Sequence, residues 1–253
     1  MATVRDRFLP MSIPANRLAA CFGLIGDTHI PERLVALPDS LFEALQGVDA
    51  ILHTGDLSEL RVLEELRRIA PAVAVQGNDE SDEGRHVLPL HRQITIAGTR
   101  VLLIHGHYLN RAEEIASRQD ERWESKLAYR ATLGADHGAS VVIFGHIHIP
   151  LVRQFSGRLL VNPGALAAAS GATRQRRQTI ALLYVRDDGA VRVVHLDLED
   201  LTRPYDPKID WDKDFRAAHE HYHESILSTE LAADFAYLRT QRWWNHAEEG
   251  RSL

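Results

Sequence analysis

The stretch CFGLIGDTHIP, residues 21–31, is an apolar run followed by an aspartate and a histidine two positions apart. Short apolar runs of this kind are typical of buried strands, so we expect a strand from Cys21 to Gly26. Asp27 and His29 then lie just beyond the carboxyl end of that strand. In extended backbone, residues two positions apart share a face, so both side chains can act on the same partner.

Two further apolar runs continue this pattern in the first half of the chain: DAILH at 49–53 and AVAVQ at 72–76. A helical pattern at 39–46 separates the first two strands. A second helical pattern lies between Ser58 and Pro71, and Ser58 is expected to cap that helix. Alternating strands and helices with nearly continuous apolar strands predict a parallel sheet whose two faces are both covered.

The pattern changes after residue 90, where apolar segments follow one another with short turns between them. Three expected hairpins turn at Ala97-Gly98, Ser156-Gly157 and Asp188-Gly189, and VVIFGH at 141–146 supplies another strand. These strands predict a second sheet, either mixed or antiparallel. The predicted fold class is therefore α/β, a two-sheet β-sandwich flanked by helices.

Three units are expected along the chain. Residues 1–20 are predicted to be a loose N-terminal tail, residues 21–199 the main domain, and residues 200–253 a helical C-terminal extension. Within the main domain, residues 111–133 are charged and helical in pattern, which predicts an excursion from the sheets. The extension is acidic and rich in aromatic residues, so it is a candidate surface for forming a homo-oligomer.

The composition excludes several classes of function. Of the 253 residues, 45% are hydrophobic and 25% are charged, which is typical of a globular protein. The net charge of −6 gives no basis for binding a nucleic-acid polymer or an anionic membrane surface. No apolar run is long enough to span a membrane. The single cysteine cannot form an internal disulfide, so we expect a cytoplasmic protein.

Side chains that can bind metals follow five of the predicted strands. They lie at or just beyond the carboxyl ends of those strands: Asp27 and His29, Asp56, Asn78, His105, and His146 and His148. Because the carboxyl ends of strands in open α/β sheets converge on one crevice, we expect these seven residues to lie together. Packing alone gives no reason to place seven oxygen and nitrogen donors at one edge.

The types of donor indicate a metal centre. Carboxylate, amide and imidazole groups without thiolates suit Mn, Fe, Zn or Ni better than Ca or a structural zinc site. Seven donors exceed what one tetrahedral ion needs, whereas two divalent ions that share a bridging carboxylate would use all of them. Pairs of ions about 3.5–4 Å apart are typical of hydrolytic enzymes.

Five motifs occur in order along the chain: DTH (27–29), GD (55–56), GN (77–78), His105 and GHIH (145–148). Together they resemble the signature of the calcineurin-like metallophosphoesterases. Their spacing is most similar to the small bacterial and archaeal phosphodiesterase branch, to which the eukaryotic retromer scaffold subunit is related. The similarity extends from about Cys21 to about Leu198, and NPG at 162–164 also resembles a turn of this branch.

The resemblance implies how the donors divide between two ions. Asp27, His29, Asp56 and His148 would hold the first ion, and Asp56, Asn78, His105 and His146 the second, with Asp56 as the bridge. It also implies a hydrolase in which a hydroxide between the ions attacks phosphorus in line. Asp56, Asn78 and His146 are then the expected catalytic residues. The expected metal is manganese, with iron, zinc and nickel as alternatives, and the expected substrate is a small phosphate ester.

One departure from the family pattern concerns the leaving group. Larger members carry a histidine after the GN pair that assists protonation of the leaving group, whereas this chain has Asp79. A carboxylate beside two cations stays ionised, so it is a poor proton donor. His107 is a candidate to take that role in the same cleft, and His53 is a candidate to orient one of the ligands.

The sequence leaves two functions open. The first is a phosphodiesterase, or a phosphomonoesterase that uses the same centre. The second is a protein-interaction scaffold of the same fold, as in the retromer relative. A scaffold has no need for metal ligands, and all seven are present here, which favours the enzyme.

Overall fold

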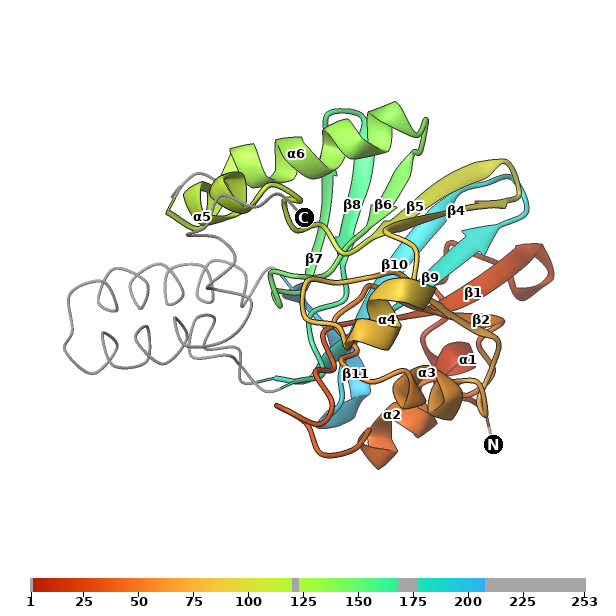
Figure 1. Ribbon diagram of the computed structural model, residues 1–253. Helices are drawn as coiled ribbons and strands as arrows, with labels where there is room; N and C mark the ends of the chain where they lie inside the picture. The colour runs from red at the N-terminus through yellow and green to blue at the C-terminus, as the bar shows by residue number, and fades with distance from the viewer. Residues whose placement is uncertain (1, 120–122, 168–176, 208–253) are drawn as a thin grey trace.

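A computed structural model describes residues 2–119, 123–167 and 177–207 of the chain (Figure 1). The first of its two sheets has six strands in the order β11-β10-β9-β1-β2-β3. Their bounds are β1 (Leu18–Ile25), β2 (Ala50–His53), β3 (Ala72–Ala74), β9 (Thr179–Arg186), β10 (Val191–Asp197) and β11 (Asp200–Tyr205). β1, β2 and β3 are parallel, as predicted, and β9 runs antiparallel to β1.

The second sheet has five strands in the order β4-β5-β6-β8-β7. Their bounds are β4 (His91–Ile96), β5 (Thr99–Ile104), β6 (Val141–Ile143), β7 (Leu151–Phe155) and β8 (Arg158–Asn162). β5, β6 and β8 are parallel, while two hairpins place β4 and β7 antiparallel at the edges. The turns of these two hairpins lie where they were predicted, at Ala97-Gly98 and Ser156-Gly157. All four residues have positive φ, which suits the twist of a hairpin.

Side chains of β1 alternate between two apolar layers. Phe22 and Leu24 pack in the cluster that joins the two sheets, which also holds Val101 and Leu103 of β5. Cys21 and Ile25 pack in a second cluster with the helices on the outer face of the first sheet. Burying a leucine or isoleucine contributes about 1.5–3 kcal/mol each. This alternation fixes the sandwich, so the predicted fold class is confirmed.

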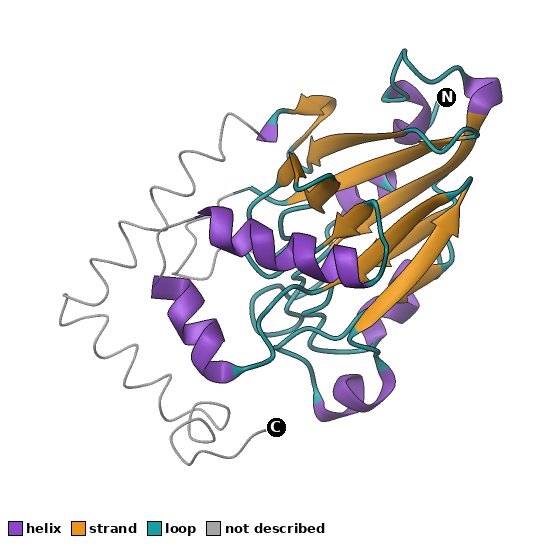
Figure 2. Cartoon of the chain, turned by 90° about the horizontal axis from the view of Figure 1, so that it is seen from above, coloured by secondary structure: helices purple, strands orange, loops and turns teal. Residues whose placement is uncertain are grey.

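Helices cover the outer face of each sheet. The helices are α1 (Val4–Arg7), α2 (Asp39–Ala44), α3 (Arg61–Leu66), α4 (Asp82–Val87), α5 (Arg111–Gln119) and α6 (Trp123–Asp136), with a short 3-10 turn at Ala15–Arg17. In Figure 1, α1, α2 and α3 lie on one side of the molecule and α6 on the other. Figure 2 shows α6 lying over the strands of the second sheet, where Leu127 and Ala131 pack against Leu102 and Val142.

The structure differs from the sequence prediction at both ends of the main domain. The N-terminal segment is not a loose tail, because Val4 and Ile13 are buried in the core and the Tyr184 hydroxyl donates to the Arg5 carbonyl at 2.8 Å. At the other end, Asp200–Tyr205 forms strand β11, so the start of the predicted helical extension is extended instead. The remainder of that extension, from residue 208 onward, lies outside the described residues.

Two local predictions are also wrong. Ser58 does not cap α3, since that helix begins after Leu60 without a side-chain cap, and the Ser58 hydroxyl donates to the Asp79 carbonyl instead. The hairpin of β9 and β10 joins the first sheet beside β1, whereas the sequence placed it in the second. Of the helices in the described ranges, none is long and apolar enough to cross a membrane.

Candidate metal centre

The loops after β1, β2, β3, β5 and β6 meet at one end of the sandwich, and hydrogen bonds join the loops of the two sheets. The His146 N–H contacts both carboxylate oxygens of Asp27, at 3.1 and 3.2 Å. His105 Nδ1 lies 2.9 Å from the Thr54 carbonyl oxygen. These contacts draw residues from two sheets into one cluster, as the strand-end positions predicted.

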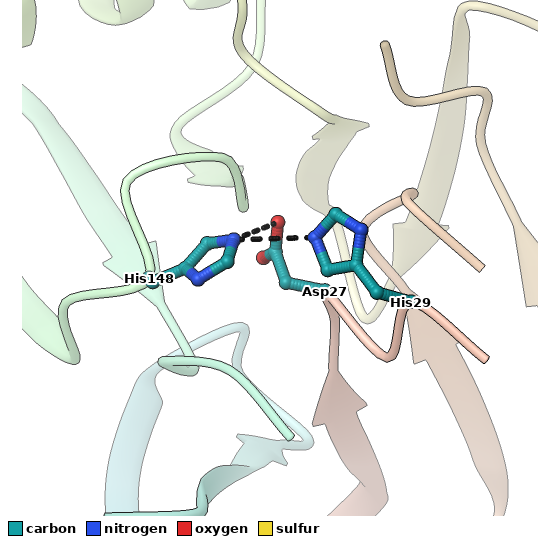
Figure 3. Close-up of side chains that lie close together, drawn as sticks. All are labelled: Asp27, His29 and His148. Carbon is teal, nitrogen blue, oxygen red and sulfur yellow. Dashed lines mark hydrogen bonds and ion pairs between the residues drawn. The ribbon is translucent and has the colours of Figure 1, made fainter. Parts of the chain in front are cut away.

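Asp27, His29 and His148 form the first part of the cluster. His148 Nε2 lies 3.2 Å from Asp27 Oδ1 and 3.4 Å from His29 Nε2. Figure 3 shows the Asp27 carboxylate between the two imidazole rings, with contacts drawn from His148 to both partners. All three side chains are almost fully buried.

Asp56 connects this group to a second one. Its Oδ2 atom lies 3.5 Å from His29 Nε2 and 3.3 Å from His105 Nε2. The same His105 nitrogen is 2.9 Å from the side-chain oxygen of Asn78. A single carboxylate oxygen thus faces a donor of each expected set, which is the position required of a bridging ligand.

His146 is placed differently from the other six expected ligands. Its ring centroid lies 5.1 Å from that of His105, so it borders the second group. Its Nε2 atom, however, lies 2.8 Å from Oε1 of Glu114, a residue of α5 that the sequence did not single out. The structure therefore gathers all seven residues at one place, but pairs the His146 side chain with a carboxylate from the helical excursion.

The backbone is strained at most of these residues. Positive φ angles occur at Asp27 (51°), His29 (44°), Asp56 (56°), His146 (70°) and His148 (58°). Side chains other than glycine rarely adopt this region, and holding one there costs about 1–3 kcal/mol. Recurrence of this strain at five expected ligands supports a functional role for the cluster.

The charged groups of the cluster stabilise one another. Burial alone would raise the pKa of Asp56, but the charges of His105 and His29 hold that pKa well below its usual value. Burial likewise opposes ionisation of Asp27, whose pKa is nevertheless lowered by His148 and His105. Burial would lower the pKa of His105, but Asp56 raises it to about 9. Both carboxylates are therefore ionised near neutral pH and suit binding of cations.

The three supporting residues named from the sequence contact the cluster in different ways. His53 accepts from the Gly55 N–H at 3.1 Å and lies 3.3 Å from the Thr28 hydroxyl, so it supports loop backbone and not a ligand side chain. Asp79 Oδ2 lies 3.4 Å from His29 Nδ1 and 3.3 Å from the Arg33 guanidinium. The His107 ring lies 5.3 Å from that of His105, between centroids. Burial lowers the pKa of both His53 and His107 to about 3.

Glu80 is a supporting residue that sequence reasoning missed. Its buried carboxylate accepts hydrogen bonds from the N–H groups of Leu57, Ser58 and Gly77, at 3.1 to 3.2 Å. It thereby ties the loop that carries Asp56 to the loop that carries Asn78. Burial, with a smaller contribution from Asp56, raises its pKa to about 7. The available signal was its position next to the GND triplet.

The NPG turn has a structural role beside the cluster. The Asn162 amide donates to the Gly145 carbonyl at 2.8 Å, and its Oδ1 atom accepts from the Gly164 N–H, also at 2.8 Å. Asn162 is fully buried. The turn therefore holds the loop that presents His146 and His148.

The donors present suit divalent transition-metal ions. In the described part of the chain, three groups offer ligand atoms that all lie within 4.8 Å of one another: Asp27, His29 and His148; Asp27, Asp56 and His105; and His29, Asp56 and Asp79. These groups offer only carboxylate oxygen and imidazole nitrogen, which Mn, Fe and Zn accept. Asp79 is thus a further candidate donor on the side of His29.

Comparison with known proteins gives the family context. The model of the calcineurin-like phosphoesterase superfamily domain matches residues 21–188. A "Probable metallophosphoesterase" of Methanothermobacter thermautotrophicus is 40% identical over 143 residues, which cover 56% of this chain and 75% of that protein. The "Probable metallophosphoesterase YsnB" of Bacillus subtilis is 28% identical over 168 residues, or 66% of this chain and 85% of that protein.

Solved structures show the same architecture. Vacuolar protein sorting 29 of Cryptosporidium parvum has a TM-score of 0.56 at 22% identity, covering 71% of this chain and 98% of that one. A predicted phosphoesterase of Streptococcus pneumoniae has a TM-score of 0.51 at 23% identity, covering 74% and 92%. At these identities the likeness establishes the fold alone. The match of the family model over residues 21–188 is the decisive finding, and the chain belongs to the calcineurin-like phosphoesterase superfamily.

Proposed function

We propose that the protein is a phosphodiesterase that uses two divalent metal ions to hydrolyse a small phosphate ester. The observation that carries this proposal is the position of Asp56, whose Oδ2 atom faces His29 at 3.5 Å and His105 at 3.3 Å. One carboxylate oxygen between two groups of donors suits a bridge between two ions. The metallophosphoesterase relatives support the reaction class.

The residues divide into two ligand sets. Asp27, His29, Asp56 and His148 would hold one ion, and Asp56, Asn78, His105 and His146 the other. When bound, the ions supply Lewis-acid activation of the phosphoryl group and of the attacking water. Manganese is the metal we propose, because carboxylate oxygens contribute to both sets and the Asn78 amide oxygen to the second. A cytoplasmic location stays a prediction from the single cysteine.

The side chains around the centre suit an anionic ester. The Arg33 guanidinium is about one-third exposed and lies 3.3 Å from Asp79 and 3.4 Å from His29 Nε2. A guanidinium at this position can donate hydrogen bonds to the oxygens of a phosphate group at the rim of the site. The ionised Asp56 stays oriented because its Oδ1 atom accepts from the Asp79 N–H at 2.7 Å.

Metal loading tests the proposed function directly. We expect purified protein loaded with manganese to retain about two ions per chain and to hydrolyse bis-p-nitrophenyl phosphate. Removal of the ions by a chelator should abolish hydrolysis, and added Mn²⁺ should restore it. Elemental analysis and a nitrophenolate assay measure these outcomes. A protein that takes up fewer than two ions, or that has no activity after loading, would refute the proposal.

The leaving group should control the rate, because Asp79 replaces the histidine that assists leaving-group protonation in larger family members. We expect kcat for nitrophenyl esters to exceed that for simple alkyl esters by at least about tenfold, since general acid catalysis typically contributes 10²–10⁴-fold. Parallel kinetics on matched nitrophenyl and alkyl diesters measure the ratio. Equal kcat values would contradict this expectation and show that another group supplies the proton. His107, the candidate from the sequence, is a poor proton donor, because burial lowers its pKa to about 3.

A protein-interaction role is the second candidate function. The observation that favours it is the fold shared with structures of vacuolar protein sorting 29 (Vps29), one of which, from Chaetomium thermophilum, was solved in complex with a cyclic peptide. An enzyme and an interaction module make opposite predictions for the metal centre. The second function is supported if two results are obtained together. The metal-loaded protein hydrolyses no ester, and the metal-free and metal-loaded proteins capture the same protein partners.

A further inference from the structure

The contact between Glu114 and His146 joins the helical excursion to the metal centre. Glu114 lies on α5 and is 4% exposed, and its Oε1 atom is 2.8 Å from His146 Nε2. Its other carboxylate oxygen accepts from the Tyr108 N–H at 3.0 Å. Because both oxygens are engaged and the residue is buried, this pair differs from a solvent-exposed ion pair, which would hold its geometry only weakly.

The chain fixes the position of Glu114 through its local structure. Asn110 precedes α5, and its side-chain oxygen accepts from the N–H groups of Ala112 and Glu113 at 2.9 and 3.2 Å. This cap sets where the helix begins, and Glu114 falls in its first turn.

The loop before α5 is fastened to α6 as well. The ring of Tyr108 stacks on that of Tyr129 at 4.0 Å between centroids. The Tyr129 hydroxyl donates to the His107 carbonyl at 3.3 Å. The two helices of the excursion are therefore attached to the same loop that carries His105. This attachment holds Glu114 in a fixed position relative to the metal centre.

The chemistry of imidazole decides what this contact does. A neutral imidazole carries one N–H, and the other ring nitrogen offers the lone pair that binds a metal. Histidines that bind metals usually donate their N–H to a carboxylate or a carbonyl, which fixes both the tautomer and the orientation of the ring. A His146 ring whose Nε2–H donates to Glu114 would bind an ion through Nδ1.

We propose that Glu114 is a positioning residue that holds His146 for the second ion by accepting the hydrogen bond from its Nε2–H. This inference rests on the proposed function. Both carboxylate oxygens of Glu114 already contact His146 and the Tyr108 N–H, so its role is to orient a ligand and not to be one. Helix α5, which lies outside the five sequence motifs, thus sets the affinity of the centre for the second ion.

Three variants test this role. Glu114→Ala removes the acceptor, Glu114→Gln retains an oxygen that can accept the same hydrogen bond, and Glu113→Ala removes an exposed carboxylate from the same helix. Titration of the metal-free proteins with Mn²⁺ should show wild-type affinity for the first ion in all three. The second ion should bind about 10–100-fold more weakly to Glu114→Ala, with partial recovery in Glu114→Gln and no change in Glu113→Ala.

Nitrogen NMR of the imidazole groups gives a readout that does not depend on activity. In the metal-free wild type, His146 should carry its proton on Nε2, and Glu114→Ala should shift it toward a mixture of tautomers. A His146→Gln variant identifies the resonance. If Glu114→Ala binds both ions with wild-type affinity, or if His146 is protonated on Nδ1 in the wild type, the role of Glu114 is refuted. A wild type that takes up fewer than two ions refutes the proposed function itself, and the role of Glu114 with it.

Discussion

Replacing Asp56 with asparagine is expected to lower kcat/KM for bis-p-nitrophenyl phosphate by at least about 10³-fold, with loss of one or both ions. Asp56 belongs to both of the proposed ligand sets, so the change should weaken the binding of both ions at once. A neutral amide also removes the negative charge that two cations require, and each tenfold loss in rate corresponds to about 1.4 kcal/mol of transition-state stabilisation. Steady-state kinetics and elemental analysis of the same sample measure the two effects.

The same substitution has a second consequence in the metal-free protein. Asp56 raises the pKa of His105 to about 9, against the effect of burial. A raised pKa stabilises the fold while the imidazole is protonated, so this contribution is fully present below the unfolded value of about 6.5 and is lost as the pH approaches 9. In Asp56→Asn, burial should dominate and the pKa of His105 should fall. NMR titration of the imidazole groups would detect this fall.

A matched control tests whether the effect is specific to Asp56 or follows from replacing any carboxylate of the chain. Asp82 lies on α4 with its side chain 93% exposed, so Asp82→Asn makes the same chemical change outside the cluster. We expect wild-type activity and metal content from that variant. If Asp56→Asn retained both ions and its activity, Asp56 would not be the bridging ligand, and the proposed mechanism would have to be abandoned.

Much of the fold could be predicted because its signals are local. The strand from Cys21, the two-residue turns at Ala97-Gly98 and Ser156-Gly157, and the polar residues after each strand depend on short stretches of sequence. The sheet that the β9–β10 hairpin joins could not be predicted, because it depends on contacts between distant parts of the chain. Antiparallel strands of similar apolar pattern fit either sheet. Burial of the N-terminal segment is non-local for the same reason, because Val4 contacts a core built by residues far along the chain.

The candidate site shows the same division. The seven expected ligands could be named because each follows a strand, and the ends of strands meet at one edge of the fold. Glu80 and Glu114 could not be named as supporting residues, because a buried carboxylate and an exposed one look alike in sequence. Their roles depend on which N–H groups and which imidazole lie opposite them, and only the folded chain sets those neighbours.

Replacing Gly77 with alanine is expected to disrupt the centre without changing any ligand. A Cβ atom built at Gly77 would lie only 2.8 Å from Cγ of Asp56, and closer still to its Oδ1 and backbone N atoms. Backbone atoms cannot move aside as a flexible side chain can, so the loop that carries Asp56 must shift. We expect the free energy of unfolding to fall by about 1–3 kcal/mol, as for other overpacked sites. Both ions should be lost, together with at least about 10³-fold in kcat/KM.

Gly98→Ala is the matched control, because a Cβ atom there meets no other heavy atom within 4 Å. Gly98 has a positive φ of 78°, so alanine should cost about 1–2 kcal/mol of stability through backbone strain alone. The two variants would then have similar stability but opposite metal content, as measured by denaturant unfolding and elemental analysis. Retention of both ions by Gly77→Ala would mean that the close packing of Gly77 against Asp56 is not what positions the bridge. Loss of the ions from Gly77→Ala alone would tie metal binding to that single point of backbone contact.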